Sequence, residues 1–489
     1  MTLTNALRSA TSALAGNAKH ASILARNVAG VGDPNYVRRD AVVTTKLYGG
    51  IKIDVQRNVQ RSLYNSAISS NADAANANTV KNGVDRLIYS MGIDDFGNSP
   101  ASMLGDLKEA VELAAAAPSN PGASSALIEH GRTFATAING LYSEVLASRA
   151  DSDKEIASSV EKLNSLLAQL ETINEQVVKG TQGQQSVLES IDIRDGILEK
   201  MSHEVGLKIV PRGDNDIMVL TSNGLVMFET NARTISFQPT ASFGPNTTGN
   251  ALYIDGVAAS GDEPWLPVTT GRLGGAFRVR DEILVNQQNQ LDEIARSVIE
   301  LFSEEDQVNG LKPKLTGMFT WDGGPAVPPV GVLQVGIAGT IRINALVDPQ
   351  SGGDPMLVRD GAINGDADYL YNSTGGSGYS DHLLNLASSF DDTTTFAPLL
   401  GLLPNQSVND FAASSLDWLN STRQAAHNIS SYQSELSIQY SHAYQSDAGS
   451  NLDTEMSKLL EVERAYQASA KLLATIDEMY AVFFNAMRA

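Results

Sequence analysis

The histidines and cysteines of a chain are the first side chains to test for metal chemistry. Here the six histidines are scattered, and SHEVG at 202–206 lacks the second histidine that completes a zinc-binding helix. There is no cysteine, so disulfides, thiolate metal sites and cysteine nucleophiles are excluded. The sequence therefore predicts no metal site and no cofactor.

Nucleophile and phosphate-binding motifs are the next candidates. TGGSGYSD at 374–381 is not the G-x-S-x-G turn of serine hydrolases, and KGTQGQQS at 179–186 lacks the Gly-Lys-Ser/Thr end of a phosphate-binding loop. Paired carboxylates in loops can act as acid and base, but in an acidic protein they are more often solvated. The candidate acids are Asp354, Asp366, Asp368, Asp391 and Asp392. We therefore predict a protein that is not an enzyme.

The charge distribution limits the classes of partner. A net charge of −21 and a pI near 4.7 argue against a general nucleic-acid binder. Residues 1–60 nevertheless hold eight lysines and arginines against three acids, so this end is expected to meet a different surface from the remainder. No run approaches the 18 apolar residues of a membrane span. The opening segment is interrupted by Arg8, Lys19 and His20, so no Sec-type signal peptide is predicted.

The first segment carries a regular apolar repeat. Eight positions follow alternating steps of four and three residues, and Asn17 is the exception among otherwise apolar side chains. These positions are Leu3, Leu7, Ala10, Leu14, Asn17, Ala21, Leu24 and Val28. The pattern predicts a helix that packs along a narrow seam against another helix.

The last segment repeats the same pattern. One set of positions keeps an unbroken spacing of seven: Leu452, Leu459, Tyr466, Leu473, Tyr480 and Met487. A second set fills the alternate positions: Met456, Val462, Ala470, Ile476 and Phe483 or Phe484. We expect the two terminal helices to pair with each other, because an isolated helix of this kind is marginally stable in water. The alternative is two ordinary core helices of a globular domain.

The sequence between these ends changes period several times. Helical patterns occupy 62–205, short β-type segments follow 205, a helix returns at 272–302, and helices resume near 408. Between them, 310–380 is rich in Gly, Pro and Asp and contains the strand candidates VLQVGI and TIRINALV. We predict an α+β fold, in which a long antiparallel helical bundle with paired, coiled-coil-like termini carries an inserted β-rich domain.

We predict three domains from these boundaries. The terminal helical domain comprises 1–45 and 446–489. The helical rod domain comprises 46–206, 271–308 and 405–445. The β-rich outer domain comprises 207–270 and 309–404.

Both ends resemble the axial proteins of the bacterial flagellum, the family of rod, hook and hook-associated proteins. The matching residues are Asn27-Val28-Ala29-Gly30 with Pro34-Asn35-Tyr36, and Asn451-Leu452-Asp453 with Glu455-Met456 and Ala465-Tyr466. Arg26, Gly30 and Asn35 depart from the family pattern, although Asn tolerates the left-handed turn that glycine usually makes. The segments 153–229 and 271–303 resemble hook-associated proteins in particular.

The resemblance implies a structural component in the first layer between hook and filament, exported by the flagellar type III system without a cleaved signal and located outside the cell. Implied partners are further copies in a helical ring, the hook protein, the second junction protein and a cytoplasmic chaperone on the C-terminal helix, with no nucleic acid and no membrane insertion. We expect interface residues along both helices and beyond the first: Leu3, Leu7, Leu14, Leu24, Tyr36, Arg38, Arg39, Leu452, Met456, Leu459, Tyr466, Leu473, Tyr480 and Phe484. Tyr36, Arg38 and Arg39 are expected to contact the next subunit.

Two alternatives remain at this point. A hook or distal-rod protein would share the same ends but occupy another layer. A secreted enzyme with an inserted hydrolase domain would also share them, although the insert shows no zinc helix and no serine turn.

Overall fold

The computed structural model describes residues 3–33, 35–45, 51–92, 99–261, 264–399 and 401–488. Its helices are α1 (Leu3–Ala29), α2 (Arg61–Met91), α3 (Pro100–Ala116), α4 (Pro121–Gln182), α5 (Leu188–Glu204), α6 (Gly271–Arg278), α7 (Leu284–Leu301), α8 (Leu357–Asp360), α9 (Asp381–Ser389), α10 (Val408–Ala448) and α11 (Leu452–Arg488). A π-helical turn, Val279–Ile283, joins α6 to α7.

The strands form small antiparallel sheets. They are β1 (Arg39–Thr45), β2 (Ile51–Arg57), β3 (Leu207–Pro211), β4 (Ile217–Thr221), β5 (Val226–Phe228), β6 (Ile235–Ser236), β7 (Tyr253–Ile254), β8 (Val257–Ala258), β9 (Phe319–Thr320), β10 (Arg342–Ile343), β11 (Thr394–Thr395) and β12 (Asn405–Gln406). The larger sheets are a β1–β2 hairpin, in which Val43 pairs with Ile53, and the three-stranded sheets β3-β4-β5 and β6-β7-β8. The predicted α+β class is therefore confirmed, with helices dominant and the strands in small inserts.

The chain divides into two compact units. Unit 1 comprises residues 1–74, 163–234 and 433–489, and unit 2 comprises 75–162 and 235–432. These units do not coincide with the three predicted domains. The strands of 207–258, predicted to lie in one domain, are divided between unit 1 and unit 2. The three-domain division stays a prediction.

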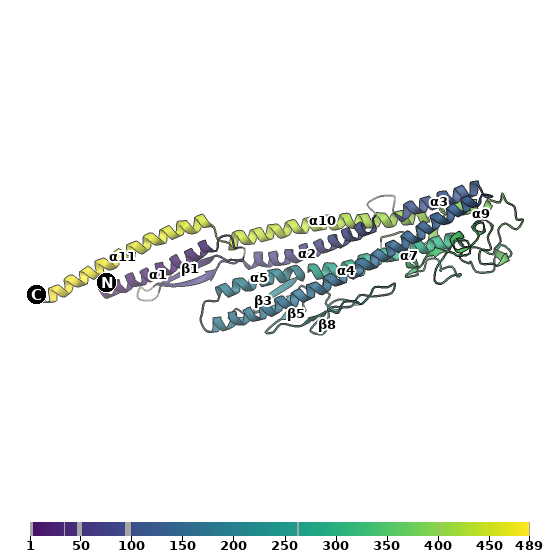
Figure 1. Ribbon diagram of the computed structural model, residues 1–489. Helices are drawn as coiled ribbons and strands as arrows, with labels where there is room; N and C mark the ends of the chain where they lie inside the picture. Colours follow the sequence, from purple (N-terminus) through teal and green to yellow (C-terminus); the bar gives the residue numbers. More distant parts are fainter. Residues whose placement is uncertain are drawn as a thin grey trace. The chain divides into compact units, whose positions relative to one another are not determined.

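Unit 1 contains the two termini, which lie side by side (Figure 1). The hydrogen bonds Asn27–Glu455, Asn17–Ser469 and Thr4–Tyr480 run in opposite order along α1 and α11, so the helices are antiparallel. The predicted pairing of the terminal helices is confirmed. Among the described residues no helix is long and apolar enough to span a membrane.

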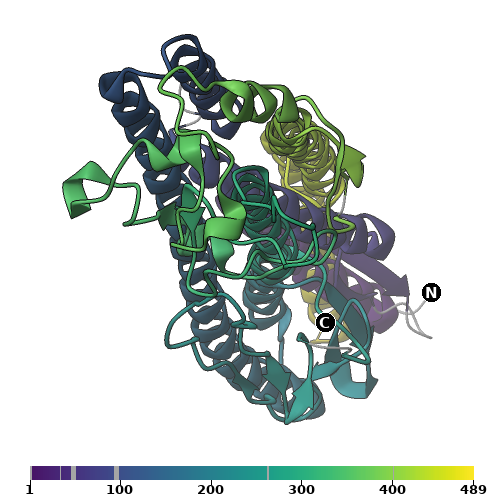
Figure 2. The same cartoon turned by 90° about the vertical axis from the view of Figure 1, so that its right-hand side faces the viewer.

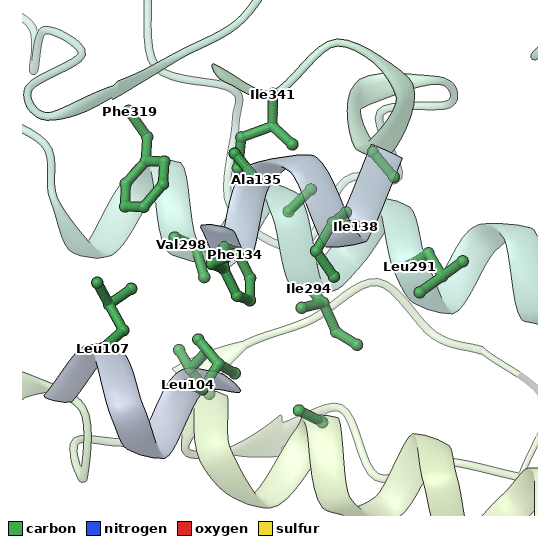
Figure 3. Packing of buried hydrophobic residues seen from close by; sticks show 14 of the residues in the cluster. Leu104, Leu107, Phe134, Ala135, Ile138, Leu291, Ile294, Val298, Phe319 and Ile341 are labelled. Carbon is green, nitrogen blue, oxygen red and sulfur yellow. The ribbon is translucent and has the colours of Figure 1, made fainter. Parts of the chain in front are cut away.

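Unit 2 is organised around α7, which lies between α4 and α10 (Figure 2). Leu291, Ile294 and Val298 of α7 pack with Leu104 of α3 and Phe134 of α4 in one buried cluster (Figure 3). Each buried aromatic or branched side chain of this kind stabilises the fold by about 1.5–3 kcal/mol. The helix predicted at 272–302 is therefore present, and the apolar residues of its α7 part lie in the core.

The polar residues of α7 are buried as well. Asp292 accepts hydrogen bonds from the backbone N–H groups of Gly336 and Ala338, both at 2.9 Å. Glu293 accepts one from Ala397 at 2.9 Å, and Ser415 of α10 donates to Gln290 at 2.6 Å. Because buried polar groups require partners, these side chains hold the surrounding loops and helices in place.

The predicted strand at 332–337 is wrong. Residues Ile337–Gly339 form a turn of 3-10 helix, preceded by Gly336 with φ of 91°. The backbone N–H groups of Gly336 and Ala338 donate to Asp292 rather than to a neighbouring strand. A tertiary contact therefore overrides the local preference of this segment. The TIRINALV segment contains only the two-residue strand β10.

Glu304 gives unit 2 a measurable pH dependence. Its side chain is 2% exposed, and burial raises the pKa of this carboxyl to about 7. Since the pKa in the folded state lies above the unfolded value, the contribution of protonated Glu304 to stability is fully present below about pH 4.5 and is lost as the pH rises through 7. In Glu304→Gln, we expect the fall in the free energy of unfolding between pH 4.5 and 8 to shrink by about 3 kcal/mol.

Urea unfolding across this pH range measures the effect. The control is Glu305→Gln, because Glu305 lies on the surface beside Lys314. A Glu304→Gln profile parallel to that of the parent chain would contradict the assignment.

Candidate subunit interface

Asn27 connects the end of α1 to three other segments. Its amide Nδ2 donates to the carbonyl of Arg39 at 3.0 Å and to Oε2 of Glu455 at 2.8 Å. Its Oδ1 accepts hydrogen bonds from the Tyr36 hydroxyl at 2.8 Å and from the backbone N–H of Arg39 at 3.0 Å. The side chain is 1% exposed, so every donor and acceptor of the amide is used inside the protein.

The turn after α1 brings Tyr36 back over the helix end. Asp33 accepts the backbone N–H of Asn35 at 2.9 Å, and Gly32 adopts φ of 90°. Gly30 leaves room for the Tyr36 ring, because a Cβ at that position would collide with the ring carbons. Pro34 of the predicted turn motif lies outside the described residues.

The first turn of α11 explains the second sequence signature. Asn451 caps the helix by accepting the backbone N–H of Thr454 at 3.1 Å. Glu455, one turn later, is 1% exposed and receives the Asn27 amide. The two signatures, 428 residues apart in the chain, therefore meet in one hydrogen bond.

Arg39 is bound within its own chain. Its guanidinium lies 3.1 Å from Asp192 of α5 and 5.0 Å from the centre of the Tyr36 ring, and it is buried. Arg57 of β2 binds the same carboxylate at 2.9 Å and Asp195 at 2.6 Å. Burial raises the pKa of Asp192 despite these two arginines.

Arg39 thus binds acidic side chains on α5 of the same chain, whereas the sequence analysis expects it to contact the next subunit. Arg38 is half-buried, and its backbone N–H donates to Ala448 at 2.7 Å. The subunit contacts expected for Tyr36, Arg38 and Arg39 stay a prediction.

The other predicted interface residues fall into two groups. Those turned toward the partner helix are buried or half-buried: Leu3, Leu7, Leu14, Leu24, Leu459, Leu473 and Tyr480. Those on the outside of α11 are exposed: Leu452, Met456, Tyr466 and Phe484. The second group is therefore the more open of the two to another molecule.

The end of α11 extends beyond α1. The Tyr480 hydroxyl donates to Thr4 at 3.3 Å, in the first turn of α1, but α11 continues to Arg488. The apolar side chains after Tyr480 are strongly exposed, from 56% for Phe483 to 70% for Met487. Contiguous exposed apolar surface of this kind marks a site of interaction.

Further exposed apolar residues of α11 were missed by the sequence analysis. Leu460, Leu472, Met479 and Val482 add exposed apolar surface to α11. They lie outside the seven-residue repeats, although ordinary helical geometry would have placed them on the flanks. Among the described residues no group of three or more histidines and acids is arranged to hold a metal ion.

Gly30→Ala tests the packing at the helix end. The added methyl group would collide with the Tyr36 ring, so we expect a loss of about 1–3 kcal/mol in the free energy of unfolding of unit 1. Gly105→Ala is the matched control, because that helical glycine of α3 has open space around it and alanine favours helix by up to about 1 kcal/mol. Urea unfolding measures both variants, and equal stability would argue against the close packing.

Two family models match this chain. Residues 94–311 match the helical domain of the flagellar hook-associated protein FlgK, and residues 438–482 match the C-terminal region of flagellar basal body rod FlgEFG proteins. The second match covers the end of α10 and most of α11, including Glu455.

Individual relatives agree with these models. The chain is 22% identical to flagellar hook-associated protein 1 of Escherichia coli K12 over 405 residues, which cover 68% of this chain and 72% of that protein. It is 25% identical to the protein of that name from Salmonella typhimurium over 162 residues, which cover 32% of this chain and 29% of that protein. The structure of the flagellar hook junction protein FlgK from Burkholderia pseudomallei shares the fold, with a TM-score of 0.58 and 12% identity over 78% of this chain and all of that chain. Residues 94–311 therefore carry the helical domain of flagellar hook-associated protein FlgK, and the chain is similar to flagellar hook-associated protein 1 over about two thirds of its length.

Proposed function

We propose that this protein is a structural, non-enzymatic subunit of the bacterial flagellum that forms the first layer at the hook–filament junction. The match of residues 94–311 to the FlgK helical domain carries this proposal. The paired terminal helices, with apolar side chains left exposed on α11, supply a surface suited to assembly.

We propose that neighbouring subunits cover the exposed side chains of α11. An unassembled chain would present Leu452, Met456, Tyr466 and Phe484 to water, together with the end of the helix. Burying a large apolar side chain between subunits stabilises the assembly by about 1.5–3 kcal/mol. The same surface would be shielded before export by a cytoplasmic chaperone bound to α11, in the helix-in-groove manner.

The remaining partners follow from the proposed position of the layer between hook and filament. The layer would contact the hook protein below and the second junction protein above, and the subunits would associate in a helical ring outside the cell. Export by the flagellar type III system is consistent with a chain that has no cysteine, because no disulfide hinders passage as an unfolded chain.

A hook or distal-rod protein is the second candidate. The match of residues 438–482 to the C-terminal region of flagellar basal body rod FlgEFG proteins is the observation that supports it. The match of 94–311 favours the junction role instead.

A clean deletion of the gene distinguishes these roles. Electron microscopy of the mutant cells and an assay for filament protein in the medium are the measurements. We expect hooks of normal length without filaments, and filament protein lost to the medium. Absence of hooks would place the protein in the hook or rod, and normal filaments would refute the proposal.

Phe484→Asp tests the exposed end of α11. Phe484 is 59% exposed, so the charge should leave the fold intact but disfavour burial against a neighbour. We expect the variant to be secreted and to fold after export, and the number of filaments to fall at least tenfold. The control is Leu113→Asp on α3, where leucine is 60% exposed, and this variant should keep filaments. Normal filament numbers in Phe484→Asp would exclude this surface from assembly.

A further inference from the structure

The apolar contacts between α1 and α11 do not by themselves fix how the helices align. The less exposed side chains of α11 along α1 include Glu455, Leu459, Val462, Ser469, Leu473, Ile476 and Tyr480. Moving each of these positions by seven residues places a second set at the seam: Val462, Tyr466, Ser469, Ile476, Tyr480, Phe483 and Met487. A heptad repeat thus permits two alignments that differ by about 10 Å.

The shifted alignment would bury large apolar side chains that are now exposed. It exchanges one carboxylate and two leucines for a tyrosine, a phenylalanine and a methionine. The three that enter the seam are Tyr466, Phe483 and Met487, which are 42%, 56% and 70% exposed in the observed alignment. Since burial of apolar surface is favourable, some other interaction must oppose the shift.

The hydrogen bond between Asn27 and Glu455 supplies this opposition. Both side chains are 1% exposed, and the amide and carboxylate oxygen are 2.8 Å apart. After a shift of seven residues Val462 would replace Glu455 opposite Asn27. One amide N–H would then be buried without its acceptor, which is costly in a packed helix pair. Asn17 would likewise exchange Ser469, its present partner at 3.3 Å, for Ile476.

We infer that Asn27 and Glu455 set the alignment of α11 on α1 and so keep the last two turns of α11 beyond the end of α1. A single buried polar residue specifies register in coiled coils by the same physical means. The idea that a neighbouring subunit binds Phe483, Phe484 and Met487 rests on the proposed function. The alignment itself does not.

The absence of cysteine allows a direct test on the purified full chain. Leu7→Cys/Ile476→Cys reports the observed alignment, because these positions lie between the Thr4–Tyr480 and Asn17–Ser469 pairs. Leu7→Cys/Phe483→Cys reports the alignment shifted by seven. Disulfide formation under mild oxidation is compared with that of the same pair in the urea-unfolded chain, since a disulfide requires closely spaced Cα atoms.

In the parent background we expect the 7–476 disulfide to form at least tenfold faster than the 7–483 disulfide. Adding Asn27→Leu/Glu455→Leu should remove this preference or reverse it. An unchanged preference would overturn the inference, because the apolar seam or the short link at 449–451 would then suffice. A parent chain with no preference would also overturn it.

A charge series keeps the test decisive if the leucine variant does not fold. Asn27→Asp places two buried carboxylates together without the amide donor, so the 7–476 disulfide should form more slowly. Adding Glu455→Gln returns an amide donor on the other helix and should restore the rate. Glu455→Gln alone should have little effect, since its carbonyl still accepts from Asn27. No loss in Asn27→Asp, or no restoration in Asn27→Asp/Glu455→Gln, would overturn the inference.

Discussion

The buried amide of Asn27 is the interaction on which the arrangement of both termini depends. It is bound at once by the turn after α1, by the first residue of β1 and by the first turn of α11. A side chain of another type would leave at least one of these groups buried without a partner, and such groups cost about 1–3 kcal/mol each. The end of α1 at Asn27 and the start of α11, with Asn451 and Glu455, are therefore two parts of one structural feature.

Unit 2 uses buried polarity in a comparable way. Asp292, Glu293 and Gln290 of α7 bind loop backbone or a neighbouring helix, while Leu291 and Ile294 fill the apolar core. A sequence-based reading assigns such polar residues to the solvent face of an amphipathic helix. The helix is enclosed on all sides. Its polar face therefore binds and positions loop segments that have little regular structure of their own.

This difference explains which parts of the fold follow from the sequence. The terminal helices, α7 and the strands after residue 206 follow from periodicity, because each has an apolar face that must be buried. The segment 332–337 does not, since its conformation is decided by Asp292, some 40 residues earlier. For the interface, the repeats identified both helices but could not separate Leu459 and Leu473, which face α1, from Met456 and Tyr466, which face outward. Nor does spacing reveal that Arg39 binds Asp192 within the chain.

The distance in sequence between α1 and α11 has a kinetic consequence. Their contacts close a loop of more than 400 residues, so they are among the most non-local contacts that this chain can make. During synthesis α11 emerges after every other described element, so the face of α1 that packs on α11 stays uncovered until then, although β1 and β2 already contact another part of α1. The entropy cost of closing a loop grows only slowly with its length, so the main consequence concerns the order of folding events. The helix α1 is made before the other described helices and is among the last to reach its final packing.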